Sequence, residues 1–315
     1  MLNTSLVFIT AGGNMRVGEG KVFVVQGPTA SGKTSLAISL AKSLGTEIIS
    51  ADSRQFYREM TIGTAKPTAD ELRQVKHHFV HSHSIQTEVT ASQYAKEAKP
   101  ILDALLSKNG SAVIVGGSGM FIDALTFGLD EIPHDKLTQL KYTDLFEKVG
   151  LEVLQEQLKN LDPVYYDRVD LHNPVRLIRA LEVIELTGKP YSELRKGSVK
   201  HTYHMARFGI EWKRDDLYRR IDSRVDQMLK EGLLDEAKLL FPQRNLKSLN
   251  TVGYRELFSY WEHEYSYEIA LEKIKQHTRN YAKRQLTWLK RYDDLVKLDP
   301  YLEISLENQV FAALI

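Results

Sequence analysis

The 315-residue chain contains no cysteine. Disulfides, thiolate nucleophiles and cysteine-ligated zinc or iron–sulfur centres are therefore excluded. No apolar run reaches the roughly 18 residues that a membrane-spanning helix needs, so we expect no contact with a membrane. Charge of one sign is not in excess either, because 42 Lys and Arg face 41 Asp and Glu. Any binding of a polyanion must then depend on local patches of charge.

The composition is that of a globular protein, with 43% hydrophobic and 26% charged residues. Residues 1–20 have no basic stretch before their short apolar segment, so they do not resemble a secretory leader. We predict that residues 1–20 are a disordered or misassigned extension, with Met15 as a candidate start. The expected compartment is the cytoplasm.

Three short apolar segments, 22–25, 47–50 and 112–115, have the length of buried strands. They alternate with helix-period segments over 36–44 and 91–107, the second of which we expect to be interrupted at Pro100. Strand–helix–strand alternation predicts an α/β fold in which helices cover both faces of a parallel sheet.

The pattern changes after about residue 130, where residues 137–194 become helical with little clustering of β-branched residues. We predict a helical insertion over 135–200 in a core formed by 21–134 and 201–315. The core is expected to continue with a strand over 205–212 and amphipathic helices over 215–241 and 267–292.

A glycine-containing segment between the first strand and its helix fits the pattern G-x-x-x-x-G-K-[ST]. Such a loop directs backbone N–H groups and a helix N-terminus at an anion, so it predicts a P-loop NTPase-like fold that binds a di- or triphosphate. The lysine would neutralise phosphate charge, and the final hydroxyl can ligate Mg²⁺. The residues of this phosphate loop are Gly27, Pro28, Thr29, Ala30, Ser31, Gly32, Lys33 and Thr34.

One carboxylate, Asp52, follows the second strand, at the edge of the sheet where α/β proteins bind substrates. It can accept a proton or hold a metal, or it can simply form a turn or cap a helix. The third strand ends in Gly116-Gly117 and not in the aspartate that motor and switch NTPases carry there. This favours group transfer over an engine driven by hydrolysis.

Six separated segments together resemble the bacterial tRNA dimethylallyltransferases, or tRNA isopentenyltransferases. The resemblance runs from about Lys21 to Leu298, and several motifs in one order are more specific than any single one. The segments are GPTASGKT (27–34), SADSRQFYREMTIGTAKP (50–67), VGGSGMFIDAL (115–125), RLIRALEVIELTGKP (176–190), VGYRE (252–256) and RNYAKRQLTWLKR (279–291).

The resemblance implies transfer of a dimethylallyl group from dimethylallyl diphosphate to N6 of adenine 37 in tRNAs that read codons beginning with U. It implies that Asp52 accepts the amine proton, while the phosphate loop, Lys33 and Mg²⁺ at Thr34 stabilise the departing diphosphate. Arg220 and Arg224 match an arginine-bearing helix that would clamp the same group; pairing with Asp216 or Asp222 on a solvated face is the alternative.

The resemblance also implies which residues contact tRNA, its expected partner, in the anticodon stem-loop. Val175 replaces a commonly polar residue, which weakens the expectation of a hydrogen bond there. The implied contacts are Asp52, Ser53, Arg54, Gln55, Ser118, Val175, Arg176, Leu177, Ile178, Arg179, Gly253, Tyr254 and Arg255.

The helix over 267–292 supports RNA binding without the resemblance. Between residues 273 and 291 lie seven Lys and Arg, Lys283 and Arg284 among them, and no acid. A run of one sign indicates a phosphate track, with an ordinary solvated helix end as the alternative. Tyr281 and Trp288 lie seven residues apart, which favours the core over base stacking for both.

Four histidines, His77, His78, His81 and His83, suggest a metal site, but no suitably spaced carboxylate lies nearby, which favours a structural or substrate-edge role. Other functions share the phosphate loop: a small-molecule kinase that binds ATP, a prenyltransferase acting on free adenylate, or an RNA-binding protein without activity. The long helical insertion favours a macromolecular acceptor, and intact Lys33, Thr34 and Asp52 argue against lost activity. We expect the protein to act as a monomer.

Overall fold

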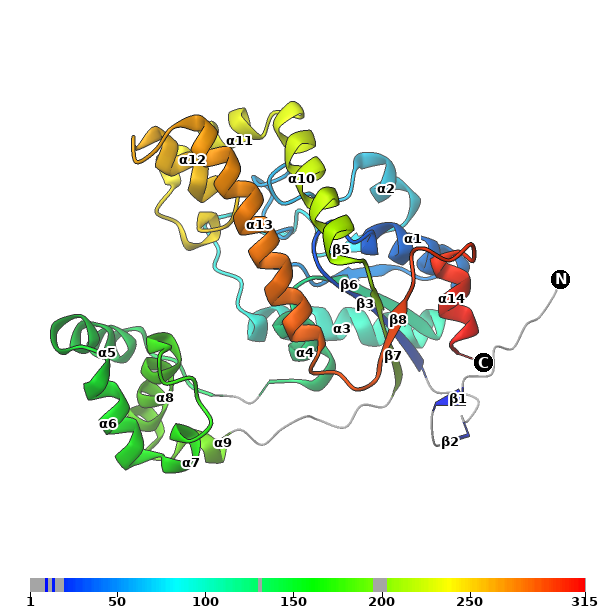
Figure 1. The fold of residues 1–315 in the computed structure, drawn as a ribbon. Helices are drawn as coiled ribbons and strands as arrows, with labels where there is room; N and C mark the ends of the chain where they lie inside the picture. The colour runs from blue at the N-terminus through cyan, green and yellow to red at the C-terminus, as the bar shows by residue number, and fades with distance from the viewer. Residues whose placement is uncertain (1–8, 11–12, 15–19, 130–131, 195–202, 315) are drawn as a thin grey trace. The chain divides into compact units, whose positions relative to one another are not determined.

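The computed structural model describes residues 9–10, 13–14, 20–129, 132–194 and 203–314 (Figure 1). Two short strands near the N-terminus, β1 (Ile9–Thr10) and β2 (Gly13–Asn14), pair antiparallel. Most of the predicted extension over residues 1–20, with Met15, lies outside the described residues.

A six-stranded parallel sheet forms the centre of the larger unit, in the order β5-β4-β6-β3-β7-β8. This confirms the predicted α/β fold. The four strands expected from the sequence are present, while the short edge strands β5 and β8 were not expected. The strands are β3 (Gly20–Gln26), β4 (Ile48–Ser50), β5 (His77–His78), β6 (Ser111–Gly116), β7 (Tyr203–Ile210) and β8 (Leu295–Leu298).

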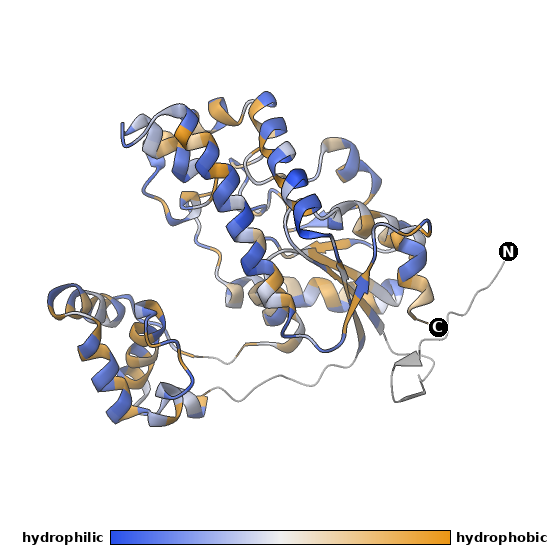
Figure 2. Cartoon of the chain, viewed as in Figure 1, coloured by the Kyte–Doolittle hydropathy of each residue, from blue (hydrophilic) through white to orange (hydrophobic). Residues whose placement is uncertain are grey.

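Helices cover both faces of this sheet, and the central strands are apolar (Figure 2). Along β3, Phe23 and Val25 join the core beneath α1 (Lys33–Ser43) and α14 (Leu306–Ala312). Val22 and Val24 join the opposite core. That core also includes side chains from α3 (Ala91–Asn109), α4 (Gly119–Phe127), α10 (Arg214–Lys230), α11 (Leu233–Leu240), α12 (Tyr254–Trp261) and α13 (Tyr267–Leu289).

Two helix boundaries differ from those expected. Pro100 does not interrupt α3, which runs continuously from Ala91 to Asn109. The single helix expected over 215–241 is two helices, because Gly232 adopts a φ of +101° between α10 and α11. Glycine tolerates that left-handed conformation, so the chain turns there without steric cost. The remaining short elements are α2 (Ala69–Gln74), η1 (Phe241–Gln243) and η2 (Lys247–Leu249).

Contacts within the chain divide it into two compact units, one of which spans Phe127–Lys200. This helical unit starts earlier than the insertion expected over 135–200 and has a core of its own, to which Leu154, Leu158 and Leu181 belong. Its helices are α5 (Lys136–Val149), α6 (Leu151–Leu161), α7 (Pro163–Tyr166), α8 (Pro174–Thr187) and α9 (Tyr191–Leu194). Within the described residues, no helix combines the length and hydrophobicity needed to cross a membrane.

Helix α13 packs directly on the turn that follows β6. A Cβ atom at Gly119 would lie 2.1 Å from Trp288, and one at Gly117 would lie 2.0 Å from the side-chain nitrogen of Gln285. Both distances are shorter than any van der Waals contact, so only glycine allows the helix to approach this closely. The approach brings α13 beside the phosphate loop.

This packing predicts that Gly119→Ala destabilises the protein by about 1–3 kcal/mol, because Trp288 must move to admit the methyl group. The midpoint of urea unfolding, followed by tryptophan fluorescence, measures the loss. Gly209→Ala is the matched control, since its new Cβ would meet its nearest atom, Leu295 Cδ1, at an ordinary 3.4 Å. Equal midpoints for the two variants would contradict the packing argument.

Candidate active site

The phosphate loop connects β3 to α1 with two residues in the left-handed region, Ala30 at a φ of +62° and Gly32 at +92°. Gly32 is the N-cap of α1, so the first N–H groups of the helix face the loop. The Nζ of Lys33 donates to the carbonyl of Pro28 at 3.3 Å. The segment therefore has the conformation in which backbone amides and a lysine surround a phosphate.

Two hydroxyls of the loop have no hydrogen-bond partner within the described residues. Ser31 is buried and its Oγ is unpaired, and Thr34 is half-buried with no side-chain hydrogen bond. A buried hydroxyl without a partner is unfavourable unless a ligand or water completes it. The Ser31 hydroxyl is thus suited to an anion, and the half-buried Thr34 hydroxyl is open to the shell of a hard cation.

Burial is the main cause that lowers the pKa of Lys33, to about 8. The nearby carboxylate of Asp52 raises it and the guanidinium of Arg224 lowers it further. The cation is therefore held in a site where water compensates little of its charge, and an incoming phosphate would be strongly attracted.

The two arginines of α10 that we expect to clamp the diphosphate differ in position. Arg224 donates to Thr29 Oγ1 at 3.2 Å and to the carbonyl of Ala65 at 3.0 Å, and it lines the pocket described below. The exposed Arg220 donates its Nε to the carbonyl of Ala30 at 2.8 Å. Both therefore contact the phosphate loop.

Neither arginine pairs with the aspartates considered as alternative partners. Asp216 pairs with Arg219, and Asp222 pairs with Arg279 at 2.6 Å. The alternative of a solvated face paired with these acids is therefore excluded for Arg220 and Arg224 in this structure.

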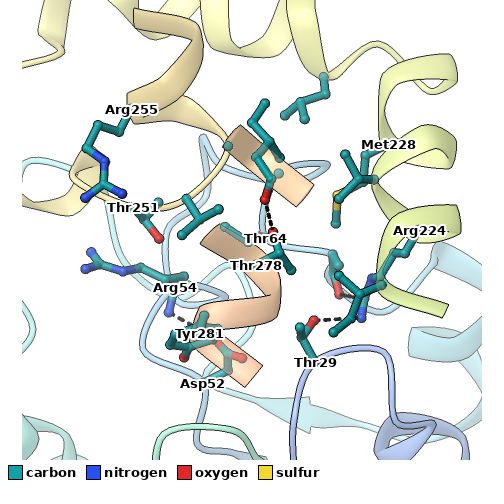
Figure 3. A pocket seen from close by; sticks show the side chains of 18 of the residues that line it. Thr29, Asp52, Arg54, Thr64, Arg224, Met228, Thr251, Arg255, Thr278 and Tyr281 are labelled. Carbon is teal, nitrogen blue, oxygen red and sulfur yellow. Dashed lines mark hydrogen bonds between the residues drawn. The ribbon is translucent and has the colours of Figure 1, made fainter. Parts of the chain in front are cut away.

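A pocket of about 270 Å³ opens beside the loop, between α10, α13 and the segment after β4 (Figure 3). Thr29, Asp52 and Arg224 form a polar end next to the phosphate loop. Side chains of Ile221, Val225, Met228, Leu233, Val252 and Ile274 supply an apolar wall. Arg54, Arg255 and Arg284 contribute three cations to the same lining.

Asp52 is half-buried and accepts a hydrogen bond from the backbone N–H of Arg54 at 3.0 Å. Figure 3 shows its carboxylate beside Tyr281. Burial and the charge of Asp52 raise the pKa of Tyr281 to about 12, so its hydroxyl stays protonated. Because Tyr281 lines the pocket, the expectation that it is a core residue is wrong; Trp288 does pack internally, against Gly119.

The structure brings part of the predicted RNA-contact set together at this pocket. Ser118 accepts a hydrogen bond from the backbone N–H of Ser53 at 3.1 Å, which places it beside Asp52, and Lys283 is exposed on α13. Lining the pocket from this set are Asp52, Ser53, Arg54, Gly253, Arg255 and Arg284.

Two residues of the predicted set make contacts inside the protein. Gln55 does not line the pocket, and its Nε2 donates to the carbonyl of Ala65 at 3.1 Å, so its contact with a purine edge stays a prediction. Tyr254 is fully buried against Gly63, where a Cβ would lie 2.6 Å from the ring. Its side chain is therefore part of the scaffold that shapes the pocket.

The remaining predicted contacts lie on α8 of the helical unit. Leu177 and Ile178 belong to its core, so their side chains are not accessible to RNA in this conformation. Arg179 donates to Glu182 at 2.9 Å and to the carbonyl of Pro133. Val175, 70% exposed, and Arg176 lie at the surface and remain candidates for contact.

The four histidines are distributed among separate partners. His78 pairs with Glu47 at 2.6 Å, His83 with Glu97 at 3.2 Å, and His81 contacts Lys66 at 3.0 Å. Across the part of the chain that the structure describes, no three His, Asp or Glu are grouped so as to hold a metal ion.

Sequence reasoning missed two residues that shape the site. Gln285 accepts from the backbone N–H of Thr29 at 3.0 Å and donates to the carbonyl of Gly117 at 2.9 Å, which ties α13 to the phosphate loop. Glu236 accepts from the backbone N–H groups of residues 61–63 and from the Tyr254 hydroxyl, which fixes one rim of the pocket. For Gln285 the one signal in the sequence was Gly117, which allows a close approach of another segment. No sequence pattern indicated the role of Glu236.

Comparison with known proteins matches this chain to one family. Residues 55–292 match the family model described as IPP transferase. A tRNA dimethylallyltransferase of Flavobacterium johnsoniae is 44% identical over 283 residues, which cover 87% of this chain and 91% of that protein. Another, of Christiangramia forsetii, is 46% identical and covers 84% of this chain and 88% of its own length.

Solved structures give the same result. The tRNA isopentenylpyrophosphate transferase of Bacillus halodurans has a TM-score of 0.68 at 34% identity, covering 93% of this chain and 94% of its own. A eukaryotic dimethylallyltransferase acting on tRNA has a TM-score of 0.75 at 25% identity, covering 89% of this chain and 74% of its own.

The pKa of Lys33 predicts how anion binding depends on pH. Lys33 loses its positive charge as the pH rises through about 8, so affinity for a diphosphate monoester should fall above that pH, by up to about tenfold per pH unit. Calorimetric titration between about pH 7.5 and 9.5 measures this, because the ligand's last ionisation, with a pKa near 6, is nearly complete there. Lys33→Arg keeps its charge and should remove the dependence; a flat profile for the unsubstituted protein would contradict the assignment.

Proposed function

Because this chain belongs to the IPP transferase family, we propose that it is a tRNA dimethylallyltransferase, which moves a five-carbon allylic group from dimethylallyl diphosphate to an adenine of tRNA. The observation that carries the proposal is one pocket with Thr29 of the phosphate loop, Asp52 and Arg224 at one end, an apolar wall, and three further arginines in its lining. These features match an anionic leaving group, a hydrocarbon and an RNA.

The acceptor atom we propose is N6 of adenine 37, next to the anticodon of tRNAs that read codons beginning with U. The exocyclic amine is a weak nucleophile because its lone pair is delocalised into the ring. As the carbon–nitrogen bond forms, Asp52 takes the proton that the amine loses, a contribution of about 10²–10⁴ in rate. The backbone N–H of Arg54, which donates to Asp52 at 3.0 Å, orients the carboxylate for this step.

The leaving diphosphate sets the second requirement, since negative charge accumulates as its bond to the allylic carbon breaks. Lys33, the loop amides and Arg224 would stabilise that charge, because Lys33 and Arg224 both bond to the phosphate loop. Arg220, bound to the Ala30 carbonyl, adds a further cation beside the loop. The buried, unpaired Ser31 hydroxyl is a further donor to a phosphate oxygen.

We also propose Mg²⁺ as the cofactor. The Thr34 hydroxyl, which has no hydrogen-bond partner within the described residues, is an oxygen ligand of the kind Mg²⁺ prefers. Mg²⁺ bound there would neutralise diphosphate oxygens. Lys33 and Thr34 are consecutive at the start of α1, so both belong to the end of the phosphate loop.

The apolar wall distinguishes this reaction from phosphoryl transfer. Ile221 and Val225 lie one helical turn apart on α10, with Arg224 between them in sequence and also in the pocket. A hydrocarbon attached to the diphosphate would lie along these side chains, where its removal from water is favourable. A small-molecule kinase or a prenyltransferase acting on free adenylate would have no use for the basic surface of α13.

For RNA we propose that a single chain binds the anticodon stem-loop in the cytoplasm. Arg54, Arg255 and Arg284 line the pocket from three different segments, and Lys283 is exposed beside Arg284. Chemistry on a base requires that the base leave its stack, and flanking cations can hold the phosphates of the distorted loop.

Replacing Asp52 tests the reaction. Asp52→Asn should reduce turnover by at least about 100-fold, because the amide cannot accept the proton, while affinity for an anticodon stem-loop RNA stays nearly the same. Product formation is followed by mass spectrometry of the RNA. Asp103→Asn, a change at an exposed residue of α3, is the control. Undiminished turnover of Asp52→Asn would remove this residue from the proton-acceptor role.

Removing charge from α13 tests the RNA surface. Lys283→Gln with Arg284→Gln should weaken RNA binding and reduce the log–log salt slope by up to about 2, with affinity for diphosphate unchanged. Binding is measured between 50 and roughly 200 mM salt. Lys96→Gln with Lys108→Gln, on the exposed side of α3, removes equal charge elsewhere. A slope equal to that of this control would assign α13 to the scaffold alone.

A further inference from the structure

The outer side of the phosphate loop is held by a tryptophan that has no place in the mechanism above. Trp212 lies between the end of β7 and the start of α10 and does not line the pocket. Its indole N–H donates to the carbonyl of Ser31 at 2.9 Å. The only polar atom of this side chain is thus committed to the loop.

Arg220 completes a second contact with the adjacent peptide. Its Nε donates to the carbonyl of Ala30 at 2.8 Å, and its guanidinium carbon lies 4.3 Å from the centre of the Trp212 ring. Stacking of this kind holds an arginine in place without consuming its remaining donors. The terminal nitrogens of Arg220 have no partner within the described residues, and one would lie 4.0 Å from a Cβ on Gly32.

The tryptophan ring is itself supported from behind. Tyr301 packs edge-on against it at a centroid distance of 5.6 Å and an angle of 75°. The Tyr301 hydroxyl in turn bonds to Asp216 on α10. The ring therefore has little freedom to turn away from the loop.

These contacts determine where the loop amides point. In a trans peptide the C=O and the following N–H project in opposite directions. Anchoring the Ser31 carbonyl to Trp212 therefore directs the Gly32 N–H away from Trp212. The Ala30 carbonyl is anchored to Arg220, and the Ser31 N–H of the same peptide donates to the Pro28 carbonyl at 3.4 Å. Ala30 has a positive φ angle of +62°, a conformation that a residue other than glycine keeps only where its surroundings enforce it.

We propose that Trp212 is a positioning residue for the diphosphate: it fixes the Ser31–Gly32 peptide with its N–H towards the anion and holds Arg220 beside the loop. The inference rests on the proposed function for the identity of the bound group, a diphosphate ester. It concerns binding of that group and not the transfer of the allyl chain, so the two can fail separately.

The test separates the indole N–H from the ring. Trp212→Phe removes the donor and keeps a face for Arg220 and an edge for Tyr301, whereas Trp212→Leu removes all three. We expect Trp212→Phe to raise both the KM for dimethylallyl diphosphate and the Kd for inorganic diphosphate by about fivefold, the effect of one hydrogen bond. Trp212→Leu should raise both further, while the KM for the RNA stem-loop stays unchanged for either variant.

Fluorescence supplies an independent readout, because an indole bonded to the loop should report anion binding. Inorganic diphosphate should change the tryptophan emission of the unsubstituted protein and of Trp261→Phe, whose ring packs with Phe241 and Phe258 elsewhere in the core. The change should be lost in Trp212→Phe. Circular dichroism and the urea midpoint establish that each variant is folded.

Three results would overturn the proposal: unchanged diphosphate affinity in Trp212→Phe, an equal rise in the KM for diphosphate and for RNA, or no binding of diphosphate to the unsubstituted protein. Weakened diphosphate binding in a protein that transfers no allyl group would support the positioning role and refute the proposed function. Weakened diphosphate binding in Trp212→Phe, together with normal transfer of the allyl group, supports both the positioning role and the proposed function.

Discussion

The geometry of the site depends on two hydrogen bonds of the Gln285 side chain, which link α13 to the phosphate loop and to the turn after β6. Its amide accepts from Thr29 in the phosphate loop and donates to Gly117 in the turn after β6, and it is almost fully buried. Removing it would leave two backbone groups without partners in a buried position, which is costly. Gln285 lies one turn beyond Tyr281 on α13. Its two hydrogen bonds therefore set the distance between the phosphate loop and the residues proposed to meet the base.

The proposed reaction places two opposite electrostatic requirements on one pocket. It needs an anion bound firmly at the loop and a carboxylate in the same pocket that can take a proton. Asp52 favours the charged form of Lys33, and Arg224 opposes it. The two groups therefore shift the pKa of Lys33 in opposite directions before any substrate binds. The apolar side chains of α10 exclude water beside them, which strengthens each of these interactions.

Much of the fold could be predicted because buried parallel strands are short apolar runs, as in 22–25 and 112–115, and because the phosphate loop depends on local sequence. The break at Gly232 and the role of Tyr281 could not. Periodicity says that a side chain faces inward, but not whether it meets a core or a cavity. Leu177 and Ile178 show the converse, since a motif shared with a family does not say which of its side chains face solvent.

Residues that act through hydrogen bonds between segments distant in sequence could not be predicted from the sequence either. Gln285 and Thr29 are separated by more than 250 positions, and Trp212 and Ser31 by about 180. Such pairs depend on the three-dimensional arrangement of α10 and α13 over the sheet edge. The sequence does record one side of this arrangement, in the glycines at 117 and 119 that admit α13.

The most direct measurement of the central claim, that an allylic diphosphate and an adenine amine meet at Asp52, compares two acceptor RNAs. One anticodon stem-loop carries adenine at the target position and the other carries purine, which lacks the exocyclic amine. Each is incubated with protein, Mg²⁺ and either dimethylallyl diphosphate or ATP, and its mass is determined. We predict the gain of one five-carbon unit only for the adenine RNA with the allylic diphosphate. An equal gain by the purine RNA, or phosphate transfer from ATP in place of any gain, would contradict the account.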